Sequence, residues 1–369
     1  LEASCCFSAA ASSTLRKREK TGETRAHTHT EEREMGWLSL SVCILLLASS
    51  LPLPPASAVD GTLAPGETIS GNQTLVSAGG AFALGFFSPA GATVPRNRYL
   101  GVWYNAIPNR TVVWVANRET PLTDPAGVFT LTGDRNLAVV DSNGTLVWSS
   151  AANGVANGTV AVLLDTGNLV LRQGDGSNAW ESFDHPGDTY QPEMKLRSNF
   201  RTGEAQRILA WRASGDPYPG NFSFGIDPRT FLQIITWRGD NPYWRSHVWN
   251  GKSLSGVRET NATAAQYVIK VVRDAQQISI SFSPTAGSAP ARYVLDWTGT
   301  VKMLIWVEAL GAWVQQWSRP SQFCDLYDRC GPSGTCDSSV DPPTCICLQG
   351  FVPRNQTEWS RRNFSGGCV

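Results

Sequence analysis

The sequence has no excess of charge and little charge of either sign. Its 31 basic residues balance 31 acidic ones, and only 17% of the 369 residues are charged. A neutral chain offers no electrostatic basis for binding nucleic acid or an anionic membrane surface. Low charge also disfavours long exposed helices. The many glycines, prolines and tryptophans instead indicate short strands joined by turns, in a chain long enough for two or three domains.

Long hydrophobic runs are also scarce, and none after residue 58 could span a membrane. The marked run, Leu38–Leu47, follows Met35 and precedes prolines and Ala56-Ser57-Ala58. This order predicts a secretory signal peptide over 35–58, in preference to a core helix or a membrane anchor. Residues 1–34 are charged and aperiodic, so we interpret them as an unfolded upstream segment. The chain is therefore expected to be secreted, or to be a plasma-membrane ectodomain if the gene continues.

Cysteine is absent from residue 44 to residue 323, and six of the nine cysteines form one block near the end. An even, compact set predicts disulfides made in an oxidising compartment, although six cysteines allow 15 pairings. Zinc is the alternative, but the Cys345-x-Cys347 spacing suits a zinc knuckle poorly. The block comprises Cys324, Cys330, Cys336, Cys345, Cys347 and Cys368.

Eight N-x-Ser/Thr sequons follow the predicted signal peptide, which predicts N-glycosylation at exposed turns of a secreted chain. They are Asn72, Asn109, Asn143, Asn157, Asn221, Asn261, Asn355 and Asn363.

Catalytic motifs are missing as well. After the signal peptide only His185 and His247 remain, and neither lies near a Gly-x-Ser-x-Gly elbow or a kinase motif. A pairing of His185 with Asp184 or Asp188 is conceivable, and with Glu181 these acids imitate a glycosidase pair. We interpret them instead as a corner between two β domains. The sequence predicts no enzyme, no cofactor and no metal site.

The sequence does contain an internal repeat. GDRNLAVVDSNGTLVW from Gly133 recurs as DTGNLVLRQGDGSNAW from Asp165, which places Asn136 and Asn168 32 residues apart, and likewise Trp148 and Trp180. The turn at 142–144 predicts that each copy is a hairpin. One hairpin cannot bury its apolar face alone, so copies should pack around a shared tryptophan centre, with an eroded third copy near 80–86.

Further segments read as strands because they are β-branched or aromatic and end at turn residues. In the first domain these are 82–87, 99–104 and 112–115; in a second β domain they are 207–211, 231–237, 267–272, 278–282, 292–297 and 301–307. Asp216-Pro217-Tyr218-Pro219-Gly220 predicts a rigid turn.

Longer motifs resemble a known plant family. TVVWVANRETPLTDPAGVFTLTGDRNLAVVD, LLDTGNLVLR and WESFDHPGDTYQPEMKL are similar to the bulb-type lectin domain of S-locus glycoproteins and S-domain receptor-like kinases. WRASGDPYPGNFSFGIDPR and NPYWRSHVWNGKSLSGV resemble the S-locus glycoprotein domain that follows, and CDLYDRCGPSGTC with CICLQGFVP resembles the EGF-like module.

The resemblance implies an all-β fold: a bulb-type lectin β-prism over 59–184, a β-rich S-locus glycoprotein domain over 200–315 and a small disulfide-rich EGF-like module over 320–369. It implies the pairs Cys324–Cys336, Cys330–Cys345 and Cys347–Cys368. Ser321-Gln322-Phe323 stand where calcium-binding modules carry acids, so no calcium site is expected. In the family a PAN/apple module, a membrane helix and a Ser/Thr kinase usually follow.

Mannose-binding members carry Gln-x-Asp-x-Asn-x-Val-x-Tyr. Of that motif only Asp134 and Asn136 remain in the first copy, and Asn168 with Val170 in the second. A monosaccharide site supplies about 4 kcal/mol, and each lost hydrogen bond removes about 1 kcal/mol. We therefore expect these residues to bond their own backbone. The alternative is a degenerate carbohydrate site at Asp134, Asn136 and Asn168.

The resemblance implies a recognition protein, of the kind associated with pollen recognition and receptor signalling. Its expected partner is a secreted protein or peptide ligand, with glycans as a second class and a homodimer or a receptor as a further partner. The ligand surface is expected in the S-locus domain, around Tyr243-Trp244-Arg245 and 261–266.

Overall fold

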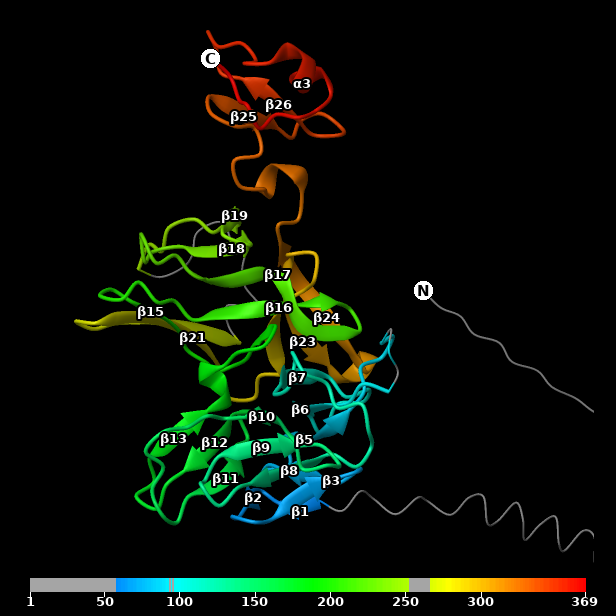
Figure 1. Cartoon of the computed structure of the whole chain (residues 1–369). Helices are drawn as coiled ribbons and strands as arrows, with labels where there is room; N and C mark the ends of the chain where they lie inside the picture. Colours follow the sequence, from blue (N-terminus) through cyan, green and yellow to red (C-terminus); the bar gives the residue numbers. More distant parts are fainter. Residues whose placement is uncertain (1–57, 93, 95, 252–265) are drawn as a thin grey trace, which may run out of the picture. The chain divides into compact units, whose positions relative to one another are not determined.

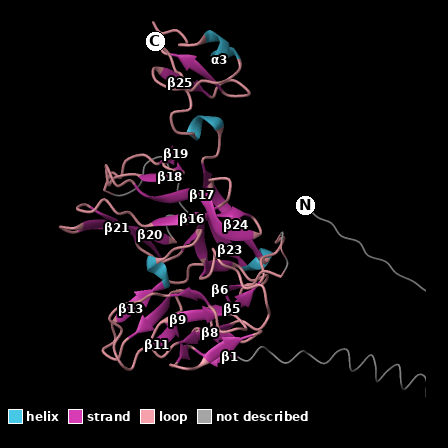
Figure 2. Cartoon of the chain, viewed as in Figure 1, coloured by secondary structure: helices cyan, strands magenta, loops and turns pink. Residues whose placement is uncertain are grey.

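The computed structural model describes residues 58–92, 94, 96–251 and 266–369, all within one compact unit of the chain. The predicted upstream segment 1–34, the predicted signal peptide up to residue 57, and Asn261 with residues 262–265 lie outside the described residues. Strands dominate what is described (Figures 1 and 2), which confirms the all-β prediction. Among the described residues, the α-helical element is the short α3 (Gln356–Ser360), and no helix there is long and apolar enough to cross a membrane.

The first domain is a prism of three sheets in the described chain. One sheet has the order β1-β4-β5-β6-β7, the second β10-β9-β8-β3 and the third β13-β12-β11-β2. The strands are β1 (Ala58–Asp60), β2 (Thr62–Leu63), β3 (Thr68–Ser70), β4 (Thr74–Val76), β5 (Phe82–Phe87), β6 (Tyr99–Tyr104), β7 (Val112–Val115), β8 (Val128–Leu131), β9 (Leu137–Val140), β10 (Leu146–Ser149), β11 (Val160–Leu163), β12 (Leu169–Arg172) and β13 (Asn178–Glu181).

The predicted repeat is a hairpin in each copy. β9 pairs antiparallel with β10, and β12 with β13. The first turn closes because Gly144 adopts a φ of 78° and donates to the Asp141 carbonyl at 3.1 Å, while the Asp141 side chain accepts from Thr145 N at 2.8 Å. A left-handed φ is favourable for glycine, as the Asn-Gly signal requires.

Three tryptophans, one from each sheet, form the centre of the prism. Trp114 lies on β7, Trp148 on β10 and Trp180 on β13, and their ring centroids are 5.9–6.1 Å apart in edge-to-face arrangements. Edge-to-face pairs contribute about 0.5–1.5 kcal/mol beyond burial. The shared centre predicted for Trp148 and Trp180 is confirmed, and Trp114 completes it.

The second domain repeats this architecture with three sheets in the described residues. Their orders are β14-β22-β23-β24, β15-β21-β20 and β16-β17-β18-β19. The strands are β14 (Thr189–Tyr190), β15 (Leu196–Asn199), β16 (Arg207–Ala213), β17 (Asp216–Ile226), β18 (Ile234–Arg238), β19 (Asn241–Arg245), β20 (Tyr267–Arg273), β21 (Gln277–Pro284), β22 (Ala291–Leu295), β23 (Val301–Val307) and β24 (Ala312–Arg319). They enclose one apolar cluster that includes Phe282 and Met303, so we call this domain the second prism.

The rigid turn predicted at Asp216–Gly220 is wrong, because these residues begin β17. The turn lies at Ser214-Gly215, and Ala213 pairs with Asp216 across it. The prolines are tolerated because β18 pairs with β17 only from Phe222 onward, and the pairing with β16 is interrupted by register shifts.

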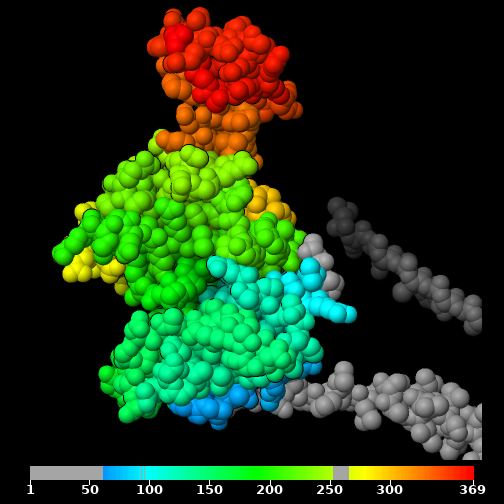
Figure 3. All heavy atoms as spheres, in the orientation of Figure 1, coloured from blue at the N-terminus to red at the C-terminus, as the bar shows by residue number. Residues whose placement is uncertain are grey.

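The two prisms are joined through buried side chains, and their atoms touch in the space-filling view (Figure 3). Arg118 of the first prism, 8% exposed, donates from Nε to the Pro217 carbonyl at 2.7 Å and from Nη2 to the carbonyls of Leu209 and Ala210 at 3.0 Å each. Trp313 of β24 packs 5.2 Å from the ring of Tyr104. Three backbone carbonyls on one guanidinium fix this junction, because its planar fork can satisfy several acceptors at once.

The cysteine-rich end holds β25 (Gly334–Asp337), β26 (Thr344–Cys347) and α3. Asn355 begins α3 as its N-cap, and its side chain accepts from the backbone N of Thr357 and of Glu358. Little apolar surface is buried here apart from Phe364 and the disulfides, as expected for a small module held by covalent links.

Candidate functional site

In the first copy of the repeat, the side chain of Asn136 forms hydrogen bonds to other residues of the first prism. Its Oδ1 accepts from Ser150 Oγ at 2.9 Å and from Ala152 N at 2.7 Å, and its Nδ2 donates to Asp134 Oδ2 at 3.2 Å. Ser150 Oγ in turn accepts from Leu137 N at 3.0 Å. The amide thus anchors the start of β9 to the chain after β10.

Asp134 is exposed beside it. Its carboxylate contacts the Thr132 hydroxyl and accepts from Asn136, and these hydrogen bonds, that from Thr132 first, hold the pKa of Asp134 below its usual range. Ala138 and Val140 stand where the sugar-binding motif has Val and Tyr. A charged carboxylate therefore faces solvent without the neighbours that complete a mannose site.

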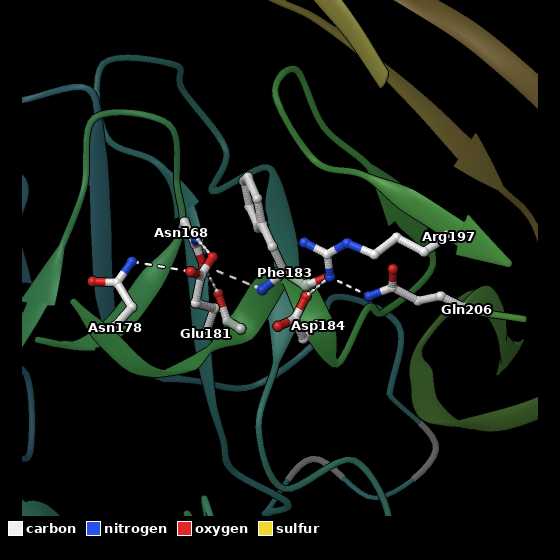
Figure 4. Close-up of polar contacts among 8 residues, drawn as sticks. Asn168, Asn178, Glu181, Phe183, Asp184, Arg197 and Gln206 are labelled. Carbon is white, nitrogen blue, oxygen red and sulfur yellow. Dashed lines mark hydrogen bonds and ion pairs between the residues drawn. The ribbon is translucent and has the colours of Figure 1, made fainter. Parts of the chain in front are cut away.

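In the second copy, Asn168 has the same role and is only 5% exposed. Its Oδ1 accepts from Ser182 Oγ at 3.0 Å and Phe183 N at 3.2 Å, and its Nδ2 donates to Glu181 Oε2 at 2.9 Å (Figure 4). Asn178 occupies the other oxygen of Glu181 at 3.0 Å. The network uses both acceptor positions of the amide oxygen and one of the two amide hydrogens, so a sugar that contacted Asn168 would compete with bonds of the fold.

The third copy lies one strand later than predicted. Residues 80–86 mostly form β5, which is equivalent to β8 and β11; the equivalent of β9 and β12 is β6. There Leu100 N donates to Asn117 Oδ1 at 2.8 Å, in place of the serine hydroxyl used by Leu137 and Leu169, and Tyr99 stands where the other copies have asparagine. The repeat was misplaced because Leu100 and Trp114 are 14 residues apart, against 11 in the other two copies.

The histidine and acids near residue 185 do not assemble a catalytic group. The His185 ring stacks on Trp180 at 5.2 Å, and its carbonyl accepts from Trp114 Nε1 at 2.9 Å. Asp184 pairs with Arg197, as Figure 4 shows, while Asp188 accepts from Thr189 Oγ1 at 3.0 Å. Each acid has a different structural partner, so this segment is a corner between the prisms.

The cysteines form three disulfides: Cys324–Cys336, Cys330–Cys345 and Cys347–Cys368. These are the pairs that the resemblance to EGF modules implies. The sulfurs of Cys330, Cys336 and Cys345 lie within 4.8 Å of one another, as zinc ligands would. Zinc binds thiolates, however, and each of these sulfurs is bonded to another sulfur.

A cleft of about 750 Å³ lies beside the surface predicted to meet a ligand. β19 and the residues after it form one wall, with Arg245 and His247, and the cysteine-rich end forms the other, with Asp325 and Asp328. Tyr327 joins the two walls, because its N donates to the Tyr243 carbonyl at 2.8 Å and Arg245 lies 4.9 Å above its ring. Of the predicted surface, Trp244 is buried and the segment 261–265 lies outside the described residues.

The sequon asparagines that the structure describes, seven of the eight, are all exposed. Asn143 lies in the β9–β10 turn and Asn355 caps α3. Exposure of every described site is what attached glycans require.

Two features of these sites were missed in the sequence. Ser150 and Ser182 are also 32 residues apart, so the repeat itself contained the partners of Asn136 and Asn168. The contacts of Arg118 join segments about 90 residues apart, and no local pattern indicates them.

Known proteins share both domains. The family model described as D-mannose binding lectin matches residues 111–212, and that described as S-locus glycoprotein domain matches 244–355. The S-locus-specific glycoprotein S6 of Brassica oleracea is 37% identical over 308 residues, which cover 82% of this chain and 69% of that protein. Receptor-like serine/threonine-protein kinase SD1-8 of Arabidopsis thaliana is 40% identical over 324 residues, 86% of this chain and 37% of the kinase.

Among solved structures, the Japanese Marasmius oreades lectin matches with a TM-score of 0.27 and 22% identity, over 34% of this chain and 95% of that one. The chain spans 37–39% of the length of four receptor-like kinases of Arabidopsis thaliana that it matches. With a lectin domain, an S-locus glycoprotein domain and relatives that share most of its length, the chain belongs to the family of S-locus glycoproteins and G-type lectin S-receptor-like kinases.

Proposed function

We propose that this chain is an extracellular recognition protein that binds a secreted protein or peptide ligand through protein contacts, as part of cell–cell recognition or receptor signalling. Membership of a family that includes an S-locus-specific glycoprotein and receptor-like kinases supports this proposal. Three disulfides and the exposed sequons support passage through the secretory pathway.

The observation that carries the proposal is the internal use of the two repeat asparagines. The amide oxygens of Asn136 and Asn168 each accept two hydrogen bonds from the fold, and each amide nitrogen donates to a neighbouring acid. A sugar hydroxyl that donates to either amide oxygen would have to replace bonds that already exist, with about 1 kcal/mol lost for each. The first prism therefore supports recognition as a structural framework, and not through sugar contacts of the two repeat asparagines.

The cleft between β19 and the cysteine-rich end is the ligand site that we favour. It offers both signs of charge, from Arg245 and from Asp325 and Asp328, next to the partly exposed ring of Tyr327. Charged rims of mixed sign give orientation and specificity to a protein ligand, and exposed tyrosine is common at interfaces. A small folded peptide with its own acidic and basic residues fits these walls.

The test is direct binding of the secreted, purified chain to a panel of small secreted cysteine-rich proteins, measured by biolayer interferometry. Binding of at least one member should persist in excess methyl mannoside and weaken tenfold or more in Arg245→Glu. Arg201→Glu, an exposed arginine on a turn after β15, is the matched control and should bind as the wild type does. Loss of binding in methyl mannoside, or equal loss in both variants, contradicts the proposal.

A glycan-binding function is the second candidate, and the exposed carboxylate of Asp134 favours it. A site built on Asp134 and Asn136 would be weak and would need several copies to hold a ligand. Retention on mannose-agarose that disappears in Asp134→Ala would support it, and passage through the column without retention would exclude it.

A further inference from the structure

A cavity of about 360 Å³ lies where the two prisms meet. The first prism lines it with the segments 87–90 and 109–112, and the second with Trp211, Arg292 and the segment 294–297. This volume falls within the range of about 300–1,000 Å³ that small-molecule sites occupy. The junction therefore contains a cavity of a size that a ligand can occupy.

The walls of this cavity combine an apolar ring with charged side chains. Trp297 lines the cavity and is 48% exposed. The Nε of Arg292 is buried and has no hydrogen-bond partner in the described residues, while the guanidinium lies 4.8 Å above the ring of Trp313. Arg292 and Asp188 both line the cavity, so its polar wall offers donors and acceptors to a ligand. A ligand with an apolar face and many oxygens meets both walls, and sugars have that character.

Asn109 brings a sugar attachment point to this cavity. It lies on the cavity wall, is exposed, and begins the sequon Asn109-Arg110-Thr111. Asn109 and Arg110 have φ values of 66° and 42°, and Thr111 Oγ1 accepts from Trp313 Nε1 at 2.9 Å. Left-handed residues persist only where the surroundings hold them. The loop is thus anchored to the second prism with the side chain of Asn109 at the cavity.

We propose that the cavity is filled by the chain's own N-linked glycan on Asn109, and that this glycan braces the two prisms. The first N-acetylglucosamine residues present hydroxyl and acetamide oxygens to Arg292 and their carbon face to Trp297. A sugar contact of this kind is of millimolar strength when untethered. Covalent attachment supplies a local concentration in the millimolar range or above, which is enough to populate it. The inference rests on the secretory route of the proposed function, not on its ligand.

The first test is protection of the glycan. The full chain is secreted with high-mannose glycans, and native protein is treated with endoglycosidase H while occupancy and trimming are followed at each sequon by glycopeptide mass spectrometry. Asn109 should be occupied and trimmed at least tenfold more slowly than Asn143, which lies in the exposed β9–β10 turn. Equal rates, or an unoccupied Asn109, overturn the proposal.

Two variants distinguish the contact of the glycan with the cavity from its covalent attachment to Asn109. Trp297→Ala should leave occupancy of Asn109 unchanged and raise its trimming rate to that of Asn143. Asn109→Asp removes the glycan, and the new residue tolerates a left-handed backbone. It should lower the thermal midpoint by several degrees and make the cavity bind free diacetylchitobiose, whereas Asn143→Asp should do neither.

Binding of free diacetylchitobiose by the glycosylated wild type as strongly as by Asn109→Asp also overturns the proposal, because the cavity would then be vacant. Failure here leaves binding of the protein ligand and its loss in Arg245→Glu unaffected. Failure of the ligand test leaves glycan protection unaffected, so the two outcomes can be told apart.

Discussion

The amide oxygen of Asn168 accepts a hydrogen bond from the hydroxyl of Ser182 at 3.0 Å, with both side chains buried. Asn136 and Ser150 form the same pair at 2.9 Å. We expect Asn168→Ala to lower the free energy of unfolding by about 2–4 kcal/mol, because it leaves Ser182, Phe183 N and Glu181 without their partner. Urea denaturation followed by tryptophan fluorescence measures it.

Asn178→Ala is the control, because Asn178 is exposed, donates to one oxygen of Glu181 and accepts a long hydrogen bond from Arg172 Nε at 3.4 Å. It should cost less than about 1 kcal/mol. Equal effects of the two variants would contradict a structural role for Asn168.

The junction between the prisms gives a second prediction. Arg118→Lys keeps the charge but offers a single ammonium to the carbonyls of Pro217, Leu209 and Ala210, so we expect a loss of about 2–4 kcal/mol. Calorimetry should show a lower midpoint for the variant than for Arg201→Lys, in which the substituted arginine is exposed. An unchanged midpoint would mean that the junction does not depend on this arginine.

The carboxylate of Asp134 should make the stability of the folded protein depend on pH. Its folded pKa is lowered by the hydrogen bonds from Thr132 and Asn136. A lowered folded pKa stabilises the protein above the unfolded value of about 3.9, and that stability is lost as the pH falls through the folded pKa.

Asp134→Asn should therefore have a lower urea midpoint than wild type at pH 7, and the gap should narrow when the pH is lowered to about 3, below the unfolded value, because the stabilising contribution of the carboxylate falls there. Urea titrations at both pH values measure this. A gap that is the same at both would show that charge at residue 134 is irrelevant to stability.

The disulfides give a fourth prediction. Replacing Cys347 and Cys368 together with serine opens a link that spans 21 residues, and should destabilise the cysteine-rich end by about 2–4 kcal/mol. Differential scanning calorimetry should show its transition lowered, with that of the first prism retained. Non-reducing peptide mapping of the wild type should recover the three pairs, and any other pairing would refute them.

Much of the local structure could be predicted from sequence. Phe82–Phe87 and Tyr99–Tyr104 are strands with the predicted bounds, because continuous apolar runs ending at turn residues have few alternatives. The turn predicted at Asp216–Gly220 is wrong because proline and glycine also occur where a strand pairs on one side only and with register shifts, as β17 does with β16.

The candidate site was predicted in part. That Asn136 and Asn168 bond the chain itself agrees with their contacts, but the backbone groups involved lie 15 or 16 residues away rather than nearby. Tyr99 could not be recognised as the third equivalent, since neither its side chain nor its spacing to Trp114 follows the repeat. Arg292 and Asn109 meet only through the packing of two domains, which no periodicity encodes.

The indole triad of Trp114, Trp148 and Trp180 has a practical consequence. Three chromophores with centroids about 6 Å apart couple electronically in pairs, each pair joins two of the sheets, and the full coupled signal arises when all three sheets are in place. Near-ultraviolet circular dichroism of this protein should thus contain an intrinsic optical reporter of prism assembly, which needs no dye or label.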